Sequence, residues 1–164
     1  MALKDMLLPE FEMEIATARQ FLERVPVKDT AWKPHPKSTS LGALAVHVAT
    51  LPWWTAVTLT TTELDLKSTP APPPLTTIDA LLSYFDKNAA EGRAALAKAA
   101  DADFAVPWTL RMGDQAIFTL PRAVVLRSYA FSHLVHHRAQ LGVYLRLRDV
   151  PLPPSYGPTA DTGM

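Results

Sequence analysis

The chain has 164 residues, the usual size of one compact domain with a hydrophobic core of its own. Its 16 lysines and arginines balance 16 aspartates and glutamates, so no net charge draws it to nucleic acid or to an anionic membrane. It has no cysteine, which excludes disulfide frameworks and cysteine-based zinc sites and leaves nitrogen and oxygen to hold any metal ion.

The first predicted helix runs from about residue 3 to residue 24. Its apolar residues recur at steps of three and four, which places them on one helical face: Leu7, Phe11, Ile15, Ala18, Leu22 and Val25. Acidic residues interrupt the apolar ones, so the segment lacks the apolar core of a signal peptide. No stretch approaches the roughly 18 consecutive apolar residues of a membrane span. We therefore expect a cytoplasmic protein with no membrane partner.

A second helix is predicted over residues 41–64, after a proline-containing loop. Ser40 is a suitable N-cap residue, and Pro52 is expected to bend the helix because it lacks a backbone donor. The threonine-rich end of this segment also resembles a strand, which leaves the boundary open. The sequence KSTPAPPPL that follows is too rich in proline for a regular element and is predicted to be a linker.

The second half of the chain predicts two more helices. The third helix begins at Thr77 and continues to about residue 100. Two apolar runs then flank Gly113 and Asp114, a pattern typical of a β-hairpin. The last helix begins near Pro121 and continues to about Arg148, and residues 151–164 form an extended tail.

The fold class expected from these elements is all-α. Residues 1–164 are predicted to form a single domain, an antiparallel four-helix bundle with a small hairpin or loop insert before the last helix. Bundles of this kind often build binding sites between facing helices.

The last predicted helix contains the segment HLVHHRAQL, with three of the five histidines of the chain. His133 and His137 are four residues apart and therefore lie about one turn apart on the same helical face, whereas His136 points elsewhere. They belong to a stripe that continues along the helix: Leu126, Tyr129, Ala130, His133, His137, Gln140 and Tyr144. This spacing alone is a weak signal, since such histidines also occur as ordinary core or surface residues.

A third histidine strengthens the metal hypothesis. His47 lies on an apolar stripe of the second helix, where a lone histidine is more often a hydrogen-bonded core residue. Helices in bundles pack about 8–10 Å apart, so imidazoles on facing helices can meet between them. His47, His133 and His137 would then hold one divalent ion with open positions for water or substrate, which is the pattern of a catalytic site.

The segments AWKPHPKSTSLGALAVHVATLPWW and FSHLVHHRAQLGVYLRLRDVPLPPSYGPTAD, with the lengths between them, resemble the DinB-like (damage-inducible) family of bacterial metalloenzymes, part of the DinB/YfiT-like superfamily. The resemblance covers nearly the whole chain. Its most specific element is HHRAQLGVYLRLRDVPLPPSYGPTAD, since the family typically has H-H-R-G-Q-L here. Ala139 replaces the usual glycine of that motif, and Pro52 lies unusually close to the first histidine.

The resemblance implies a dimeric antiparallel bundle and a divalent ion of nickel, zinc or iron on His47, His133 and His137. It also implies a small-molecule substrate and a thiol-dependent S-transferase activity that uses a low-molecular-weight thiol. The alternatives are a metal-dependent hydrolase and a non-catalytic dimer that binds a metal or small ligand.

Other polar residues have more local predicted roles. Gln140, Tyr144 and Trp53 are candidate pocket residues, with Trp53 and Trp54 equally suited to packing. His35 is expected to lie on the surface. Asp161 belongs to the tail, which could fold over the site. Near the C-terminus of the last helix, three arginines are expected to offset the helix macrodipole: Arg138, Arg146 and Arg148.

Overall fold

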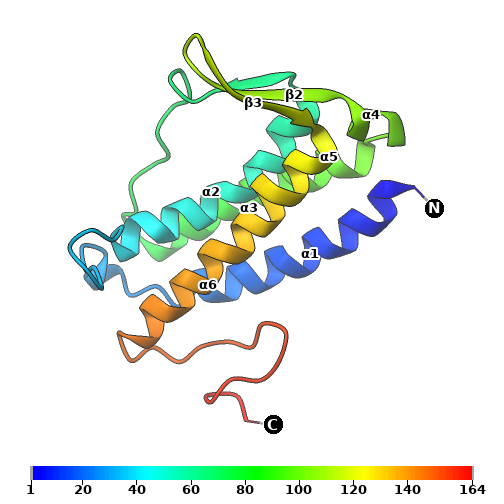
Figure 1. Ribbon diagram of the computed structural model, residues 1–164. Coiled ribbons are helices and arrows are strands. Elements are labelled where there is room, and N and C mark those ends of the chain that lie inside the picture. Colours follow the sequence, from blue (N-terminus) through cyan, green and yellow to red (C-terminus); the bar gives the residue numbers. More distant parts are fainter. Residues whose placement is uncertain (1, 164) are drawn as a thin grey trace.

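The computed structural model describes residues 2–163. The long helices are α1 (Leu3–Leu22), α2 (Leu41–Thr60), α3 (Ile78–Lys98) and α6 (Ser132–Arg146), and the short ones are η1 (Val27–Asp29), α4 (Asp101–Ala105) and α5 (Arg122–Val125). A π-helical segment, η2 (Leu126–Phe131), joins α5 to α6, and the strands are β1 (Glu63–Asp65), β2 (Pro107–Met112) and β3 (Gln115–Pro121). Figure 1 shows the long helices packed together, with the strands at one end.

Side-chain caps start two of the long helices where the sequence predicted. The Ser40 hydroxyl accepts a hydrogen bond from the Ala43 backbone N–H at 3.3 Å, and the Thr77 hydroxyl accepts one from Ala80 at 3.1 Å. Pro52 lies inside α2, which continues through it. One helix of the described residues, α2, is long and apolar enough to cross a membrane, but 67% of its apolar window is buried inside the structure, as in a core helix.

The prediction of an all-α fold was wrong, because the described residues include a three-stranded mixed sheet. The hairpin around Gly113 forms β2 and β3, and β1 adds to β2 in parallel, with Glu63 opposite Thr109. The sequence ELD has a single apolar residue and is too short for an alternating pattern to mark a strand. It pairs because the end of α2 places it beside the hairpin, where Asp65 accepts the Gly113 N–H at 2.8 Å.

The sheet covers a second, smaller core at the end of the helices. Trp108 of β2 is fully buried there with Val57, Leu110 and Val125, and its indole N–H donates to the Thr61 hydroxyl at 3.1 Å. The hairpin is therefore part of the packed structure, because it buries a large aromatic side chain between the ends of α2 and α5.

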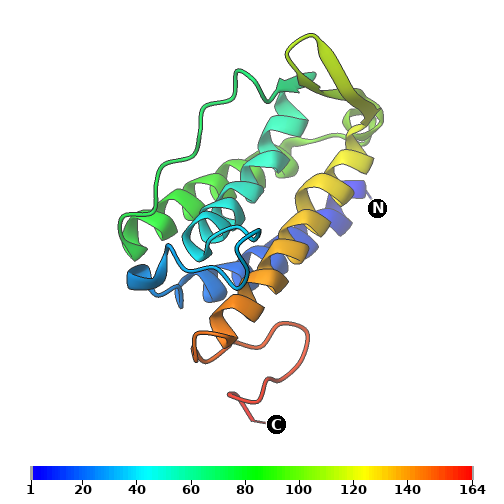
Figure 2. The same cartoon turned by 60° about the vertical axis from the view of Figure 1, so that its left-hand side comes forward.

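Helices α2 and α3 run in the same direction, which also departs from the predicted antiparallel bundle (Figures 1 and 2). The chain returns between them along the proline-rich segment 66–77. Residues 66–69 form a turn on Asp65, and residues 70–77 continue as extended chain. At about 3.1 Å per residue, these eight residues span about 25 Å. That covers most of the length of about 30 Å expected for the 20 residues of α2, at about 1.5 Å each.

Gly92 marks the closest approach of α3 to α1 and α2. A Cβ at this position would lie 2.8 Å from the Pro52 carbonyl oxygen and 2.9 Å from Cζ of Phe11. Both distances are shorter than a real side-chain contact, and the carbonyl belongs to a helix that cannot easily move. Glycine is therefore required here by packing.

We expect Gly92→Ala to lower the free energy of unfolding by about 1–2 kcal/mol, because overpacking outweighs the helix propensity of alanine. Thermal denaturation should show a decrease of several degrees in Tm. Gly157→Ala is the matched control, since a Cβ there meets nothing within 4 Å. Equal stability of the two variants would contradict the close approach.

The macrodipole interpretation fails for Arg138, which faces the interior. Its side chain is 3% exposed and forms an ion pair with the equally buried Glu14 of α1. Tyr156 of the tail completes the group: its hydroxyl donates to Glu14 at 2.7 Å and accepts from Arg138 at 2.9 Å. The tail is thus fastened to α1 and α6. Asp161 does not cover the histidines but pairs with Arg146, and Arg148 pairs with Asp29.

Candidate metal centre

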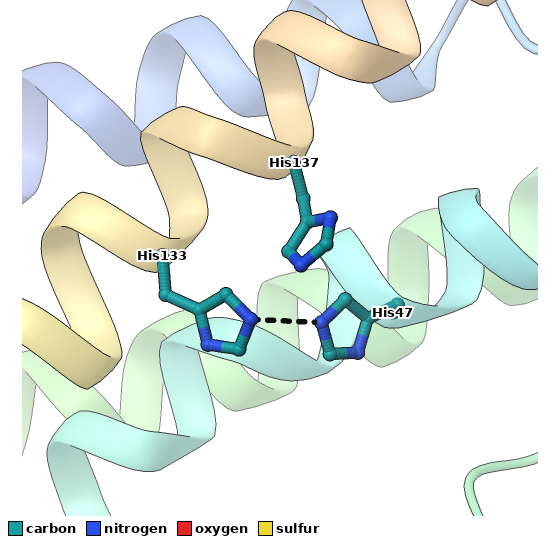
Figure 3. A group of neighbouring side chains, drawn as sticks. All are labelled: His47, His133 and His137. Atoms are coloured by element: carbon teal, nitrogen blue, oxygen red, sulfur yellow. Dashed lines mark hydrogen bonds between the residues drawn. The ribbon is translucent and has the colours of Figure 1, made fainter.

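Three of the histidines predicted from the sequence meet between α2 and α6. His47 lies in the first half of α2, and His133 and His137 lie one turn apart on the facing side of α6. Figure 3 shows the three rings turned toward a common point between the helices. The Nε2 atoms of His47 and His133 are 3.2 Å apart, and one nitrogen from each of the three rings lies within 4.8 Å of the others.

The other two histidines lie outside this group. His136 is exposed and stands edge-on to His137, with ring centroids 4.8 Å apart. His35 is also exposed, as predicted, and its Nδ1 accepts the Lys37 backbone N–H at 3.2 Å. Helix periodicity therefore correctly predicted that His133 and His137 share a face and that His136 lies elsewhere.

Hydrogen bonds at the outer edge of the group orient two rings. Nδ1 of His133 lies 3.3 Å from the Tyr129 carbonyl oxygen, and Nδ1 of His137 lies 2.7 Å from Oε1 of Gln140. Because both oxygens accept hydrogen bonds, these contacts favour a hydrogen on Nδ1 of each ring and a lone pair on its Nε2. With that tautomer, Nε2 of His133 accepts the hydrogen bond of 3.2 Å from Nε2 of His47. The arrangement is the one found around metal-binding histidines, whose outer nitrogen donates to a carbonyl.

The surroundings keep these imidazoles neutral. Burial lowers the pKa of His47 to about 4. Repulsion from His137 and His133, in their protonated forms, acts in the same direction. Burial is also the main cause that lowers the pKa values of His133 and His137. Neutral rings at pH 7 are ready to donate lone pairs to a cation, with little competition from protons.

The distances fit a divalent ion. Metal–nitrogen bonds of about 2.0–2.1 Å at angles of about 90–110° place two ligand nitrogens about 2.9–3.4 Å apart. The 3.2 Å separation of the His47 and His133 nitrogens falls in this range. The third nitrogen lies within 4.8 Å of the other two, and a side-chain rotation can bring it to the same ion. Three imidazoles suit first-row ions such as zinc, nickel and iron, and leave coordination positions open.

A π-helical turn directly precedes this pair of histidines. In η2 the Ser132 backbone N–H bonds the carbonyl of Arg127, five residues earlier, and the turn gives the helix one extra residue. Tyr129 belongs to this turn, which presents its carbonyl to His133 and its ring to Phe118 at a centroid distance of 4.4 Å. The sequence predicted a regular helix here, so the turn and its carbonyl were missed.

A hollow of about 930 Å³ extends from the histidines toward the start of α2. His47, His137, Gln140 and Tyr144 line it, whereas the third pocket candidate, Trp53, lines a separate hollow of about 220 Å³. The remaining wall comes from the first turns of α2, from residues 30–31, and from two loops that were predicted only as connections, residues 37–40 and 72–75. For residues 37–40, one feature of the sequence could have indicated a place in the hollow: they lie directly before the helix that carries His47.

We expect the metal-free protein to lose stability as the pH falls from about 6.5 toward 4. His47 has an ordinary pKa of 6.5 when unfolded and about 4 when folded. The unfolded chain therefore binds the proton first, so the stability contributed by neutral His47 is complete above pH 6.5 and is lost down to pH 4. Urea denaturation at pH 4, 5, 6 and 7 measures this loss.

His47→Gln is the control for that measurement, because it retains every carboxylate that also titrates in this range. The variant should show a shallower dependence of unfolding free energy on pH than the parent. Parallel curves for the two proteins would contradict the lowered pKa of His47.

Comparisons with known proteins agree with this architecture. A family model described as the DinB superfamily matches residues 10–141. A DinB-like protein of Bacillus subtilis is similar with a TM-score of 0.74 and 16% identity, over 94% of this chain and 99% of that chain. A DinB-like protein of Bacillus cereus gives a TM-score of 0.70 and 20% identity, over 94% and 98%. The comparison with curated proteins gave no match.

These structural similarities show a shared fold, and the family match covers most of the chain, including the three histidines. The chain therefore belongs to the DinB superfamily.

Proposed function

We propose that the protein is a metal-dependent enzyme whose divalent ion is held by His47, His133 and His137. The observation that carries this proposal is the convergence of three neutral imidazole nitrogens, within 4.8 Å of one another, beside a hollow large enough for a small molecule. Nickel, zinc and iron all suit this set of ligands.

The protein's own contribution is to orient the ligands and shape the reaction space. When bound to these histidines, the ion would supply Lewis acidity beside the hollow. The Tyr129 carbonyl and the Gln140 amide hold the rings of His133 and His137 with Nε2 directed inward. Gln140 and Tyr144 then line the path along which a substrate reaches the histidines.

The activity we propose is transfer of a group to the sulfur of a low-molecular-weight thiol. Its support is the resemblance to thiol-dependent relatives together with the open side of the histidine group. A thiol that is deprotonated at the centre is a stronger nucleophile at neutral pH than the free thiol.

The test begins with metal analysis of the protein purified without an affinity tag, where we expect one ion per chain. Cobalt-loaded protein is then titrated with 2-mercaptoethanol, and a new sulfur-to-metal absorption band shows that the thiol binds at the centre. Turnover of an alkylating electrophile that depends on the thiol would support the transferase. Turnover of esters without a thiol would replace it with hydrolysis, and binding without any turnover would contradict catalysis.

We also propose that the protein is a cytoplasmic homodimer. Apolar side chains on the outer face of α6 and on the tail support association, since Val143, Leu147 and Tyr156 are more than half exposed. Sedimentation should therefore give a dimer at micromolar concentration. A monomer under these conditions would refute the dimer and leave the metal centre unaffected.

A further inference from the structure

Residues 70–76, which we name the proline strap, run alongside α2 and α3 on the way between them (Figures 1 and 2). Four of the seven residues are proline and lack a backbone N–H: Pro70, Pro72, Pro73 and Pro74. Among the hydrogen bonds found within residues 2–163, none comes from the proline strap. Figures 1 and 2 show it as a loop that stands outside the packed helices.

The strap is held by apolar contacts through one residue. Leu75 is half-buried and packs against the main core, while the prolines themselves are exposed. The strap is anchored at both ends: the Thr69 hydroxyl donates to the Asp65 carbonyl at 2.8 Å, and Thr77 caps α3. A stiff extended segment fixed at its ends keeps its shape without internal hydrogen bonds.

Three hollows lie beneath the proline strap. Pro73, Pro74 and Leu75 line both the large hollow that reaches the histidines and a neighbouring one of about 230 Å³. Pro72 lines the large hollow and a third of about 220 Å³. The large hollow thus extends from the strap to the candidate metal centre, and the two smaller hollows share strap residues with it.

The walls of this space are apolar near the strap. Pro73, Pro74 and Leu75 line the large hollow together with Leu44 and Val46 of α2. No aspartate or glutamate lines that hollow, and its one charged group besides the titratable histidines is Lys37, at the far end beside Ser38 and Ser40. A ligand between the strap and α2 therefore meets hydrocarbon on both sides.

We propose that the proline strap is the specificity-determining wall of the substrate pocket, and that the substrate carries an apolar portion which binds between the strap and α2. This inference rests on the proposed metal site, because the polar end of the same molecule reaches the histidines. Each methylene group that the strap covers should improve binding by about two- to fourfold, the effect of removing its surface from water.

The first test does not depend on a metal ion. Hexan-1-ol is titrated into the metal-free protein while backbone amide shifts are followed by nuclear magnetic resonance. We expect the largest changes at Val46, Leu75 and neighbouring residues of α2. Changes confined to the apolar hollow between α6 and the tail, around Phe21 and Gly142, would overturn the proposal, as would no saturable change anywhere.

The second test measures chain-length selectivity on the nickel-loaded protein. Calorimetry compares acetohydroxamate, butanohydroxamate and hexanohydroxamate, whose head group binds a metal ion and whose tails grow by two methylenes each. Affinity should rise by about 4- to 16-fold at each step, from about two- to fourfold per methylene. The variant Pro73→Ser/Pro74→Ser should keep the acetohydroxamate affinity and lose most of the increase.

The control variant Pro34→Ser/Pro36→Ser alters two exposed prolines outside the hollow and should bind as the parent does. Unchanged chain-length selectivity in the strap variant would overturn the role of the strap. Failure of all three hydroxamates to bind would instead contradict the open metal site, and the hexanol titration would still decide whether the strap binds apolar groups.

Discussion

Alanine at His47, His133 or His137 is expected to lower the affinity for a divalent ion by at least about tenfold. Each replacement removes one metal–nitrogen bond. Even the residues that only hydrogen-bond to metal ligands typically contribute about 10–100-fold to metal affinity. Among residues 2–163, the group of nitrogens within 4.8 Å of one another contains only these three side chains, and the neighbouring His136 lies outside it, so no fourth ligand of the group replaces the lost one. Metal content and affinity in chelator-buffered solution measure the effect.

His136→Ala is the matched control for this series. His136 lies in the same helical turn as the ligands, yet it is exposed and outside the group. Its replacement should leave the stoichiometry unchanged, with at most a small effect on affinity. Equal losses in all four variants, or no stable binding by the parent protein, would refute the three-histidine centre.

Breaking the buried pair of Glu14 and Arg138 should produce the largest loss of stability. Arg138→Ala leaves the Glu14 carboxylate in a site where its side chain is 6% exposed. An uncompensated buried charge costs about 3–5 kcal/mol. At about 2–4 °C per kcal/mol for a chain of this size, Tm should fall by about 10 °C.

Two further variants separate the buried charge from a general effect of losing an arginine. Arg93→Ala removes the exposed ion pair with Glu12, in which the Arg93 side chain is 46% exposed and the Glu12 side chain 41%. This variant should lower the free energy of unfolding by less than about 1 kcal/mol. The double variant Glu14→Leu/Arg138→Met removes both charges and should recover most of the stability. An Arg138→Ala protein as stable as Arg93→Ala would contradict this account.

The helices could be predicted from sequence, because local rules determine them. The periodic stripe of α1 and the caps Ser40 and Thr77 were visible in the residues themselves. Strand β1 was not, since Glu63–Asp65 has no strand pattern and pairs with residues more than 40 positions later. Its strand conformation depends on tertiary contacts, which a local pattern does not contain.

The same distinction applies to the histidine group. The spacing of His133 and His137 is local, and His47 was noticeable as a polar residue on an apolar face. The carbonyl of Tyr129, in contrast, is a backbone group within a π-helical turn that no residue type announced. The walls of the hollow come from loops distant in sequence, so only the folded chain shows which of their residues face the histidines.

The buried pair also joins the first helix of the chain to its last, with 124 positions between Glu14 and Arg138. Ribosomes add roughly 5–20 residues per second, so about 6 to 25 seconds separate the synthesis of the two charges. In that interval α1 can dock on α3 through the pairs of Arg19 with Asp86 and Arg93 with Glu12. The face of α1 that carries Glu14, however, stays exposed to water, to chaperones and to proteases until α6 and Tyr156 have been synthesised and pack against it. A nascent chain halted before α6 would therefore expose the surface that the folded protein buries.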